Sequence, residues 1–600
     1  MLSISEVDGY LRNLRDKIAS VQEESSASEK LLLATNVFEQ IQDHIPSLAT
    51  HQVLSKYVEK LIVLLAHSLI EEPQSELDEK RKLCSSLCVQ VIMKADVEVL
   101  AKDVFGSHVL QSTLQCCTLF EHQGVSMSEA LKYFATTVED RCLFELLHHT
   151  SGSHVLRSLI KALAGALDAD AFQKTKRKST EKSEVLLHNK HEVEAWRLAR
   201  LEHWADLFCK DLNGSFATSQ SCATVCLAMK LCPQRPGGKL AGLCKEVLAH
   251  CFSRCTESST ASFAAEQCLE FCQNADFNCL FKSSVLPRAR ELSENTFANY
   301  VVQAIIRHRF FQTSHLESLL ECIDIGQLIL SSSSPIVWRL CEAAVTLGTG
   351  QSLFLKKLFE ALGISQYRSG ASKKKASGSN ATKRRPASQS DDTGAPGPDE
   401  AHGSTCAEDD TVTEGRKGHM WLALVSCEPV KSDQIHLRAT GASIVLNLLK
   451  FERKLIVNIL GDFRHFLRIA KMQGRLVALA TDRHFSRVLQ LMLDPRQGLL
   501  KEKQVQRIFK YLKAHFVELA LNINGAFVLS SLFKVCSLRL QQDLLAELAP
   551  EAERIRAKNK KFAEIIGLEA FCKNEALWVK KMKKTESVRA LFKDIIEPVS

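Results

Sequence analysis

A five-residue pattern recurs in order along the chain and constrains its fold more than any other feature of the sequence. A small or polar residue is followed by a polar or aromatic residue, two mostly apolar residues and a polar one. Copies begin at Ser107, Ser153, Ser215, Ser262, Asn299, Ser486 and Ala526, weaker ones at Pro335 and Ser443, and marginal ones at His51 and Lys560. Most neighbouring copies start 34 to 47 residues apart, which is the length of one two- or three-helix unit of a solenoid. The pattern therefore predicts an array of about eleven repeats.

Most of the chain between these copies has the periodicity of amphipathic helices. Apolar residues recur at three- and four-residue spacing, as in SLFLKKLFEALGI and RIFKYLKAHFVELALNI, and this spacing places them on one helix face. Strand-like alternation is scarce, and only 13 of the 600 residues are proline. We predict an all-α fold, a superhelical solenoid that curves to present a concave face.

The spacing of the copies is interrupted twice. The first long gap contains the charged stretch QKTKRKSTEKSE, and the second contains a segment rich in Ser, Gly, Lys and Asp without a hydrophobic period, which is typical of disorder. The predicted organisation is a helical cap over 1–39, a repeat arm of about seven units over 40–365 with a charged insertion near 168–195, a disordered insertion over 366–418, an arm of about four units over 419–584, and a tail over 585–600.

Net charge, apolar runs and cysteine count indicate the compartment of the protein and the state of its thiols. A net charge of +8 permits an anionic partner but does not require one. The chain opens with charged residues where a secretory leader would be apolar, and its longest apolar run, Leu61 to Ala66, is too short to span a bilayer. These features and the odd count of 21 cysteines predict a reducing compartment, no membrane anchor, and thiols that pack as small hydrophobes.

Four cysteine pairs have a four-residue spacing that would put both thiols on one helix face. They are Cys84/Cys88, Cys222/Cys226, Cys251/Cys255 and Cys268/Cys272. No Cys-x-x-Cys pair accompanies them, so we favour core packing over zinc. His188 and His191 fit a solvated helix face better than a metal site. We predict neither a metal nor a cofactor.

Three copies of the pattern carry polar triplets that resemble those of the Pumilio-type RNA-binding repeats. These are Asn299-Tyr300-x-x-Gln303, Ser486-Arg487-x-x-Gln490 and Ser262-Phe263-x-x-Glu266, with a near match in Ser107-His108-x-x-Gln111. The resemblance covers about residues 40–365 and 420–580. About eleven divergent units with a charged interruption are similar to the nucleolar protein nine branch of that family. The resemblance implies binding of precursor ribosomal RNA during maturation of the small ribosomal subunit (18S rRNA), in the nucleus and nucleolus.

In this family each unit presents one triplet to one nucleotide. The resemblance implies that Asn299 and Gln303 meet the edge of a uracil while Tyr300 stacks on a base, since amides both donate and accept hydrogen bonds. It implies likewise that Arg487 stacks through its guanidinium plane between two residues that contact an adenine, Ser486 and Gln490. The carboxylate of Glu266 suits the donors of guanine.

The remaining copies depart from the family's triplets, and a polar helix surface without a ligand is the alternative for each. We therefore expect few units to read bases, with modest sequence specificity and a clear salt dependence. Arg157, Arg339, Lys560 and Lys561 are candidates for phosphate contacts, with a solvated surface as the alternative. The predicted RNA-binding residues are Ser107, His108, Gln111, Ser153, His154, Arg157, Ser262, Phe263, Glu266, Asn299, Tyr300, Gln303, Ser486, Arg487, Gln490, Lys560 and Lys561.

Two basic clusters lie in the predicted disordered insertion. Lys373, Lys374 and Lys375 are followed by Lys383, Arg384 and Arg385, a pattern typical of bipartite nuclear import signals and equally of nonspecific RNA tethers. The predicted partners are RNA, with pre-rRNA foremost, and pre-ribosomal proteins; the chain is expected to be a monomer.

Two other classes of function compete with RNA binding. A HEAT- or armadillo-like protein scaffold would share the repeat length and helicity but would not need the polar triplets. A nuclease would need paired acidic metal ligands, and no convincing pair stands out, so we predict a non-enzymatic protein.

Overall fold

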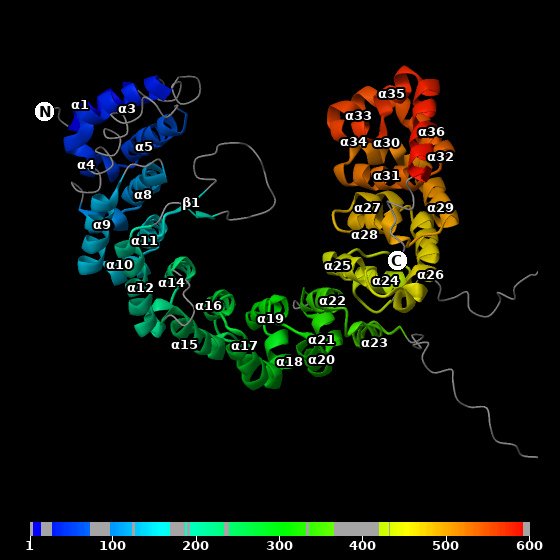
Figure 1. Ribbon diagram of the computed structural model, residues 1–600, viewed down its shortest axis with the longest axis horizontal. Coiled ribbons are helices and arrows are strands. Elements are labelled where there is room, and N and C mark those ends of the chain that lie inside the picture. Colours follow the sequence, from blue (N-terminus) through cyan, green and yellow to red (C-terminus); the bar gives the residue numbers. More distant parts are fainter. Residues whose placement is uncertain are drawn as a thin grey trace, which may run out of the picture. The chain divides into compact units, whose positions relative to one another are not determined.

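The computed structural model describes residues 4–13, 27–71, 96–122, 126–168, 186–188, 193–232, 239–331, 335–364, 419–430 and 432–591. Helices dominate these residues, which confirms the predicted all-α class (Figure 1). The chain divides into a first unit, Met1–Val285 with Tyr300–Phe310, and a second unit, Leu286–Asn299 with Phe311–Ser600. Helix α19, Ala298–Arg307, is shared between the two.

The other helices of the first unit alternate between long and short elements. They are α1 Ile4–Asn13, α3 Ala27–Ile41, η1 Gln42–His44, α4 Ile45–Ala49, α5 Leu54–Glu71, α7 Val97–Lys102, α8 Gly106–His122, α9 Ser128–Arg141, α10 Leu143–His148, α11 Thr150–Leu163, α12 Ala195–Lys210, α13 Leu212–Ser215, α14 Ser219–Leu231, α15 Lys239–Arg254, α16 Ser259–Leu269, α17 Asn274–Leu280 and the π turn η3 Phe281–Val285.

The second unit continues the same alternation. Its helices are η4 Leu286–Arg288, α18 Ala289–Glu294, α20 Thr313–Cys322, α21 Ile325–Leu330, α22 Pro335–Leu347, α23 Gln351–Ala361, α24 His419–Ser426, α25 Ala439–Leu448, α26 Arg453–Met472, α27 Leu476–Thr481, α28 Phe485–Met492, η6 Pro495–Gln497, α29 Glu502–Leu512, η7 Lys513–His515, α30 Phe516–Leu521, α31 Ile523–Val535, α32 Leu538–Leu548, η8 Ala549–Glu551, α33 Ala552–Lys558, α34 Lys560–Ile566, α35 Leu568–Lys573 and α36 Glu575–Leu591.

One small departure from the all-α prediction lies in the first unit. Strand β1, Ala166–Asp168, pairs antiparallel with β2, Leu186–His188, with Leu167 opposite Leu187. Strand β1 lies at the start of the insertion predicted near 168–195 and β2 lies near its end, and β1 packs against α8 and α11. The chain therefore leaves and rejoins the repeats through a paired base.

The repeat length allows two or three helices per unit, and most repeats have three, although α15 is followed directly by α16. A long helix is followed by a six-residue helix and then by the helix that carries the five-residue pattern, as in α9–α10–α11 and α29–α30–α31. The pattern-bearing helices of each unit pack against one another in order: α8, α11, α14 and α16 in the first unit, and α22, α25, α28, α31 and α34 in the second. We call these helices, together with α19, the triplet row.

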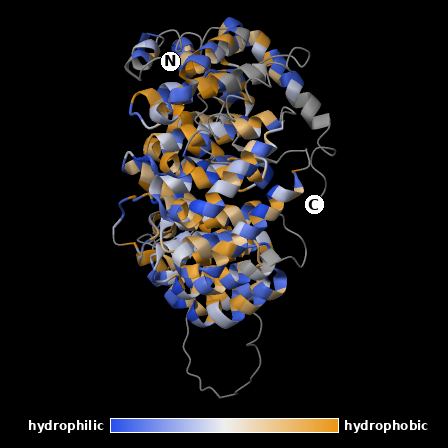
Figure 2. Cartoon of the chain, turned by 90° about the vertical axis from the view of Figure 1, so that its left-hand side faces the viewer, coloured by the Kyte–Doolittle hydropathy of each residue, from blue (hydrophilic) through white to orange (hydrophobic). Residues whose placement is uncertain are grey.

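Apolar side chains fill the space between these helices. The largest fully buried residues include Trp204 and Phe208 in the first unit and Trp421, Phe463 and Phe466 in the second. Figure 2 shows hydrophobic and hydrophilic residues side by side along the helices of the first unit, as expected of helices with one buried face. Among the described residues, no helix is long and apolar enough to cross a membrane.

Capping side chains fix where four of the triplet helices begin. The Oδ1 atoms of Asp103, Asn295, Asp482 and Asn522 each accept hydrogen bonds from the backbone N–H groups two and three residues later. Such caps satisfy N–H groups that have no partner within the helix. Each cap precedes the first residue of its five-residue copy by four positions, so the cap sets the register of the triplet.

Glycines allow the short helix to approach the triplet helix closely. At Gly525 a Cβ atom would lie 2.6 Å from the carbonyl oxygen of Leu519, and at Gly441 it would lie 2.4 Å from that of Val425. Backbone atoms cannot move aside as a flexible side chain can. Gly441 and Gly525 directly precede the buried first residues of their copies, Ala442 and Ala526. The close backbone packing therefore sets the position of the triplet.

This packing predicts opposite effects of two glycine-to-alanine changes. Gly441→Ala is expected to destabilise the protein by about 1–3 kcal/mol, because the added methyl overpacks a backbone contact. Gly461→Ala is the matched control: nothing lies within 4 Å of its Cβ position in α26, and removing a helix-interior glycine should stabilise by about 0.5–1 kcal/mol. Thermal unfolding followed by circular dichroism checks both signs, and a neutral Gly441→Ala would contradict the packing argument.

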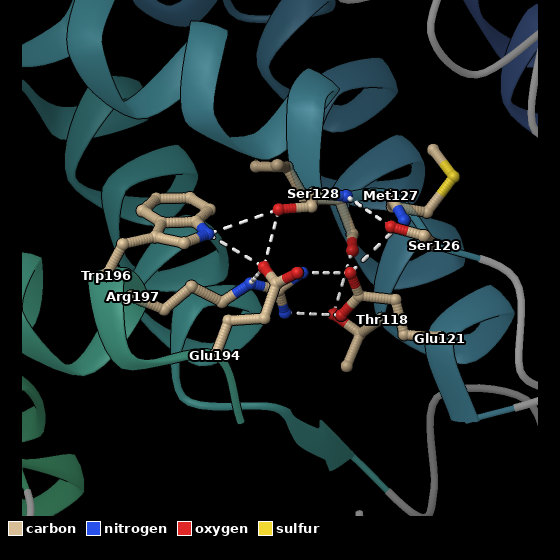
Figure 3. A network of polar contacts seen from close by, with 9 residues as sticks. Thr118, Glu121, Ser126, Met127, Ser128, Glu194, Trp196 and Arg197 are labelled. Atoms are coloured by element: carbon tan, nitrogen blue, oxygen red, sulfur yellow. Dashed lines mark hydrogen bonds and ion pairs between the residues drawn. The ribbon is translucent and has the colours of Figure 1, made fainter. Parts of the chain in front are cut away.

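An ion pair connects α12, which follows the hairpin, to α8 (Figure 3). Arg197, at the start of α12 and only 4% exposed, donates to both carboxylate oxygens of Glu121 at the end of α8. Glu194 approaches the same guanidinium at 3.4 Å and also accepts from Trp196 Nε1 at 2.7 Å. Ser128, at the start of α9, donates to Glu194. Three helices therefore meet at one polar cluster.

Candidate nucleic-acid interface

Five of the five-residue copies have the same burial pattern. The first residue is buried, the second exposed, the third and fourth buried, and the fifth half-buried; this holds for copies starting at Ser107, Ser153, Ser262, Asn299 and Ser486. An alternation of this kind leaves two side chains per helix on the open face of the triplet row. Those second and fifth residues are the candidates for contact with a ligand.

The first residues point inward, which corrects the expectation that Asn299 and Ser486 present polar groups to a base edge. The hydroxyls of Ser107, Ser153 and Ser486 donate to backbone carbonyls three residues earlier, at 3.1, 3.0 and 3.4 Å. Asn299 is only 6% exposed, and its amide nitrogen donates to the carbonyls of Asn295 and Thr296. Short polar side chains near a helix start often bond back to the backbone in this way. Ser262 is buried as well.

The second residues project from the row. Tyr300 is 56% exposed and Phe263 43% exposed, although large aromatic side chains are usually buried. His108, His154 and Arg487 occupy the same position on their helices and are also exposed. Flat or planar side chains at one position of successive helices can stack on successive bases.

The fifth residues are polar and half-buried. Gln111 and Arg157 each donate back to the carbonyl of the first residue of their copy, at 3.1 and 3.3 Å, and both line the groove described below. Burial raises the pKa of Glu266 above its ordinary value, while Arg307 opposes this shift. Gln303 and Gln490 lie at the same depth.

A groove of about 370 Å³ runs across the triplet row of the first unit. Its lining includes His154, Arg157, Lys161, Lys230 and Phe263, from the three successive helices α11, α14 and α16. Burial lowers the pKa of Arg157, and burial together with Arg157 and His108 lowers the pKa of His154. The groove therefore combines cations with an exposed aromatic ring, which suits a chain of phosphates and bases.

The structure corrects the register of three copies. The copy at Ser215 precedes α14, whose cap Thr218 places Cys222, Ala223 and Cys226 at the triplet positions. Lys560 and Lys561 lie in the first turn of α34, and the burial pattern instead places Ala563 and Glu564 at the first two positions. The copy predicted to start at Ser443 starts one residue earlier, at Ala442, which is buried and directly follows Gly441.

Sequence reasoning missed Lys161 and Lys230, which line the groove outside the five-residue copies. Each lies one helical turn beyond the fifth residue of its copy, so the side chain remains on the same face. The cap Thr218, four residues before Cys222, is the signal that could have corrected the register of α14 and placed Lys230 beside the groove.

Most of the described cysteines pack in the core, as predicted, whereas Cys279, Cys322 and Cys572 are exposed. Three of the four pairs are buried and reduced: Cys222/Cys226, Cys251/Cys255 and Cys268/Cys272. Burial raises the pKa of Cys209, Cys244 and Cys251 to about 12, so these thiols stay protonated. No cluster of three or more metal-ligating side chains occurs within the described ranges.

Several predicted features lie outside the described residues. They are Cys84 and Cys88, His191, and the two basic clusters Lys373–Lys375 and Lys383–Arg385 together with the predicted insertion around them. The side chain of His188 is likewise outside them, although its backbone belongs to β2.

Comparison with known proteins decides the family. The sequence pattern of the NOP9-like PUF repeat domain matches residues 246–559, more than half of the chain. The chain belongs to the NOP9-like PUF repeat family. The predicted resemblance to Pumilio-type repeats of the nucleolar protein nine branch is thereby confirmed. The matched residues run from α15 through α33 and include the triplet row of the second unit up to α31.

Relatives of this NOP9-like chain agree over nearly its full length. Mouse Nucleolar protein 9 is 22% identical over 632 aligned positions, which cover 99% of the chain and 91% of the mouse protein. The solved structure described as APUM23-GGAUUUGACGG superposes with a TM-score of 0.67 and 17% identity, covering 96% of this chain and 99% of that one. APUM23-GGAAUUGACGG gives 0.66 and 17%, covering 97% and 100%. At these identities the solved structures establish a shared Pumilio-repeat fold.

Proposed function

We propose that this NOP9-like PUF protein is a non-enzymatic RNA-binding protein that recognises precursor ribosomal RNA and acts in small-subunit (18S rRNA) maturation in the nucleolus. The observation that carries the proposal is the row of exposed second residues and half-buried polar fifth residues on α8, α11, α16, α19 and α28. The name of the mouse relative, Nucleolar protein 9, supports the compartment and the ribosomal role. The APUM23 structures include an RNA sequence and so support the ligand class.

In the proposed mode of binding, the second and fifth residues of each copy make different contacts with the RNA. Aromatic rings and the Arg487 guanidinium stack on bases, while fifth residues such as Gln111 and Glu266 contact base edges or sugars. The cationic groove of the first unit holds phosphates, which provide affinity but carry no sequence information. Because several helices have an alanine or cysteine in the triplet, only some nucleotides are read. Binding should then have modest sequence specificity and should accept single-stranded and structured RNA.

The first test removes two stacking rings from the triplet row. Phe263→Ala combined with Tyr300→Ala is expected to weaken binding to single-stranded RNA by about tenfold or more, since a stacked base contributes about 1–3 kcal/mol. Labelled oligonucleotides, GGAUUUGACGG among them, are titrated by fluorescence anisotropy at two salt concentrations. Tyr133→Ala with Phe144→Ala is the matched control, because both rings are exposed on α9 and α10.

Two outcomes would count against the proposal. Equal losses in the test and control variants would show that aromatic rings elsewhere matter as much as those of the triplet row. No binding of any RNA by the intact protein would favour a protein-binding scaffold instead.

The domain organisation and the import signal remain part of the proposal. We infer repeat arms over 40–365 and 419–584 that flank an inserted segment, with Lys373–Lys375 and Lys383–Arg385 serving nuclear import. Pre-ribosomal proteins are the proposed protein partners of a monomeric chain.

A further inference from the structure

The second unit carries a concentrated positive charge on helices that do not belong to the triplet row. Helices α26 and α29 pack side by side and lie along one side of the unit in Figure 1, whereas α25, α28 and α31 lie along the other. Together α26 and α29 contain eight arginine and lysine residues against two acidic ones. The whole chain has a net charge of only +8. Most of that excess is therefore found on two neighbouring helices.

A groove of about 210 Å³ lies between these two helices. Arg464 and Arg468, one turn apart on α26, line one side, and Arg507 of α29 lines the other together with Gln504 and Tyr511. All three arginines are exposed. Guanidinium groups that converge from two helices can each donate several hydrogen bonds to one anionic group.

The three arginines lack intramolecular counterions. Within the described part of the chain, none of them forms an ion pair, whereas Arg438 pairs with Glu428 and Arg556 with Glu553 in the same unit. Like charges held close together repel one another. An external anion would relieve this repulsion, so the groove is suited to bind one.

The cations continue beyond the groove in two rows. Lys471 lies one turn after Arg468, and its ammonium group is 4.8 Å from the ring centroid of Tyr511, which lines the groove. On α29, Lys503 and Lys510 lie one turn before and one turn after Arg507 and are also exposed. A single carboxylate or phosphate would need only the three arginines. Extended rows of cations match a polymer with regularly spaced charges, such as a nucleic-acid backbone.

We propose that the groove between α26 and α29 is a second RNA-binding site, which holds the sugar–phosphate backbone without regard to sequence. The proposal rests on the proposed function in that the ligand is RNA, but it does not depend on base reading by the triplet row. The triplet row would bind a single-stranded segment, and the groove between α26 and α29 would bind a second segment of the same folded RNA. Affinity for structured RNA then exceeds affinity for an isolated strand through effective concentration.

The test compares two variants with the same change in charge. The groove variant is Arg464→Gln, Arg468→Gln and Arg507→Gln; the control variant is Arg539→Gln, Arg554→Gln and Arg556→Gln, exposed positions of the same unit. The probes are the single strand GGAUUUGACGG and the same strand joined to a hairpin stem. Circular dichroism melts establish that both variants fold.

The groove variant should bind the single strand like the control but lose about tenfold in affinity for the strand joined to the stem, with a salt slope smaller by about 2–3. Ultraviolet crosslinking of the stem should map to peptides of α26 and α29. Equal affinities of the groove and control variants for the stem-containing probe would overturn the proposal. Displacement of the crosslinked stem by polyglutamate at equal charge would overturn it in favour of an acidic protein partner.

The design separates this site from the proposed function. Suppose that Phe263→Ala with Tyr300→Ala leaves all binding intact while the groove variant weakens stem binding. The triplet-row mechanism then fails and the groove proposal is supported. An intact protein that binds neither probe overturns both.

Discussion

Replacing Arg197 with alanine is expected to destabilise the first unit by about 3–5 kcal/mol, because it leaves the carboxylate of Glu121, whose side chain is only 14% exposed, without its charged partner. The guanidinium is almost fully buried and donates to both Glu121 oxygens, so water cannot take its place. Thermal and denaturant unfolding followed by circular dichroism measure the loss. Hydrogen exchange at α8 and α12 should rise together, since the pair joins these two helices.

A double variant provides the control for Arg197. Arg197→Met with Glu121→Leu removes both charges and keeps similar volume, and it should recover most of the loss, since apolar replacements of buried pairs are often neutral or stabilising. A single variant that loses less than about 1 kcal/mol would show that the pair behaves like an exposed one. Equal stabilities of the single and double variants would place the cost in lost packing.

The second large effect is expected from reversing charge in the groove of the first unit. Arg157→Glu, Lys161→Glu and Lys230→Glu should lower RNA affinity by about 100-fold or more at moderate salt and reduce the salt slope by about 2–3, as expected for three lost phosphate contacts. Affinities for several RNA sequences should fall by similar factors, because phosphate contacts carry no sequence information. Anisotropy titrations over a salt series measure both quantities.

A charge-matched control separates local contact from the overall field of the protein. Lys132→Glu, Lys210→Glu and Lys245→Glu change the net charge equally on α9, α12 and α15, the long helices of the first unit. These lysines are exposed or paired at the surface, so the fold should tolerate the change. Comparable losses in both variants would assign the effect to long-range attraction and would remove the groove from the proposed interface.

The repeat architecture could be predicted because its signals are local and recur. Helical periodicity and the ordered copies at Ser262, Asn299 and Ser486 determine the unit length, the fold class and the family without any long-range information. The exposed second residues, Tyr300 among them, were also predictable, since an aromatic ring flanked by apolar pairs must lie on the open side of its helix.

Other parts of the site depend on contacts that a sequence does not display. The pair Glu121–Arg197 joins residues 76 positions apart, on either side of an insertion. The inward turn of Asn299 depends on two carbonyls that are free only because the helix begins there. The groove between α26 and α29 requires knowing that these two helices are neighbours. The copy predicted at Ser215 lies in α13, one helix before the triplet helix α14. The five-residue pattern can therefore be assigned to the wrong helix when the capping residue is not taken into account.

The caps and close-packed glycines have a consequence for how the repeats can diverge. Positions that build a repeat (the cap, the glycine, the buried first residue) are different from the two positions that face outward. A mutation at Tyr300 or Glu266 can therefore change or abolish a base preference while the solenoid keeps its stability. Successive repeats are free to drift apart in what they recognise, and a long array can retain its architecture while only a minority of its units still discriminates between nucleotides.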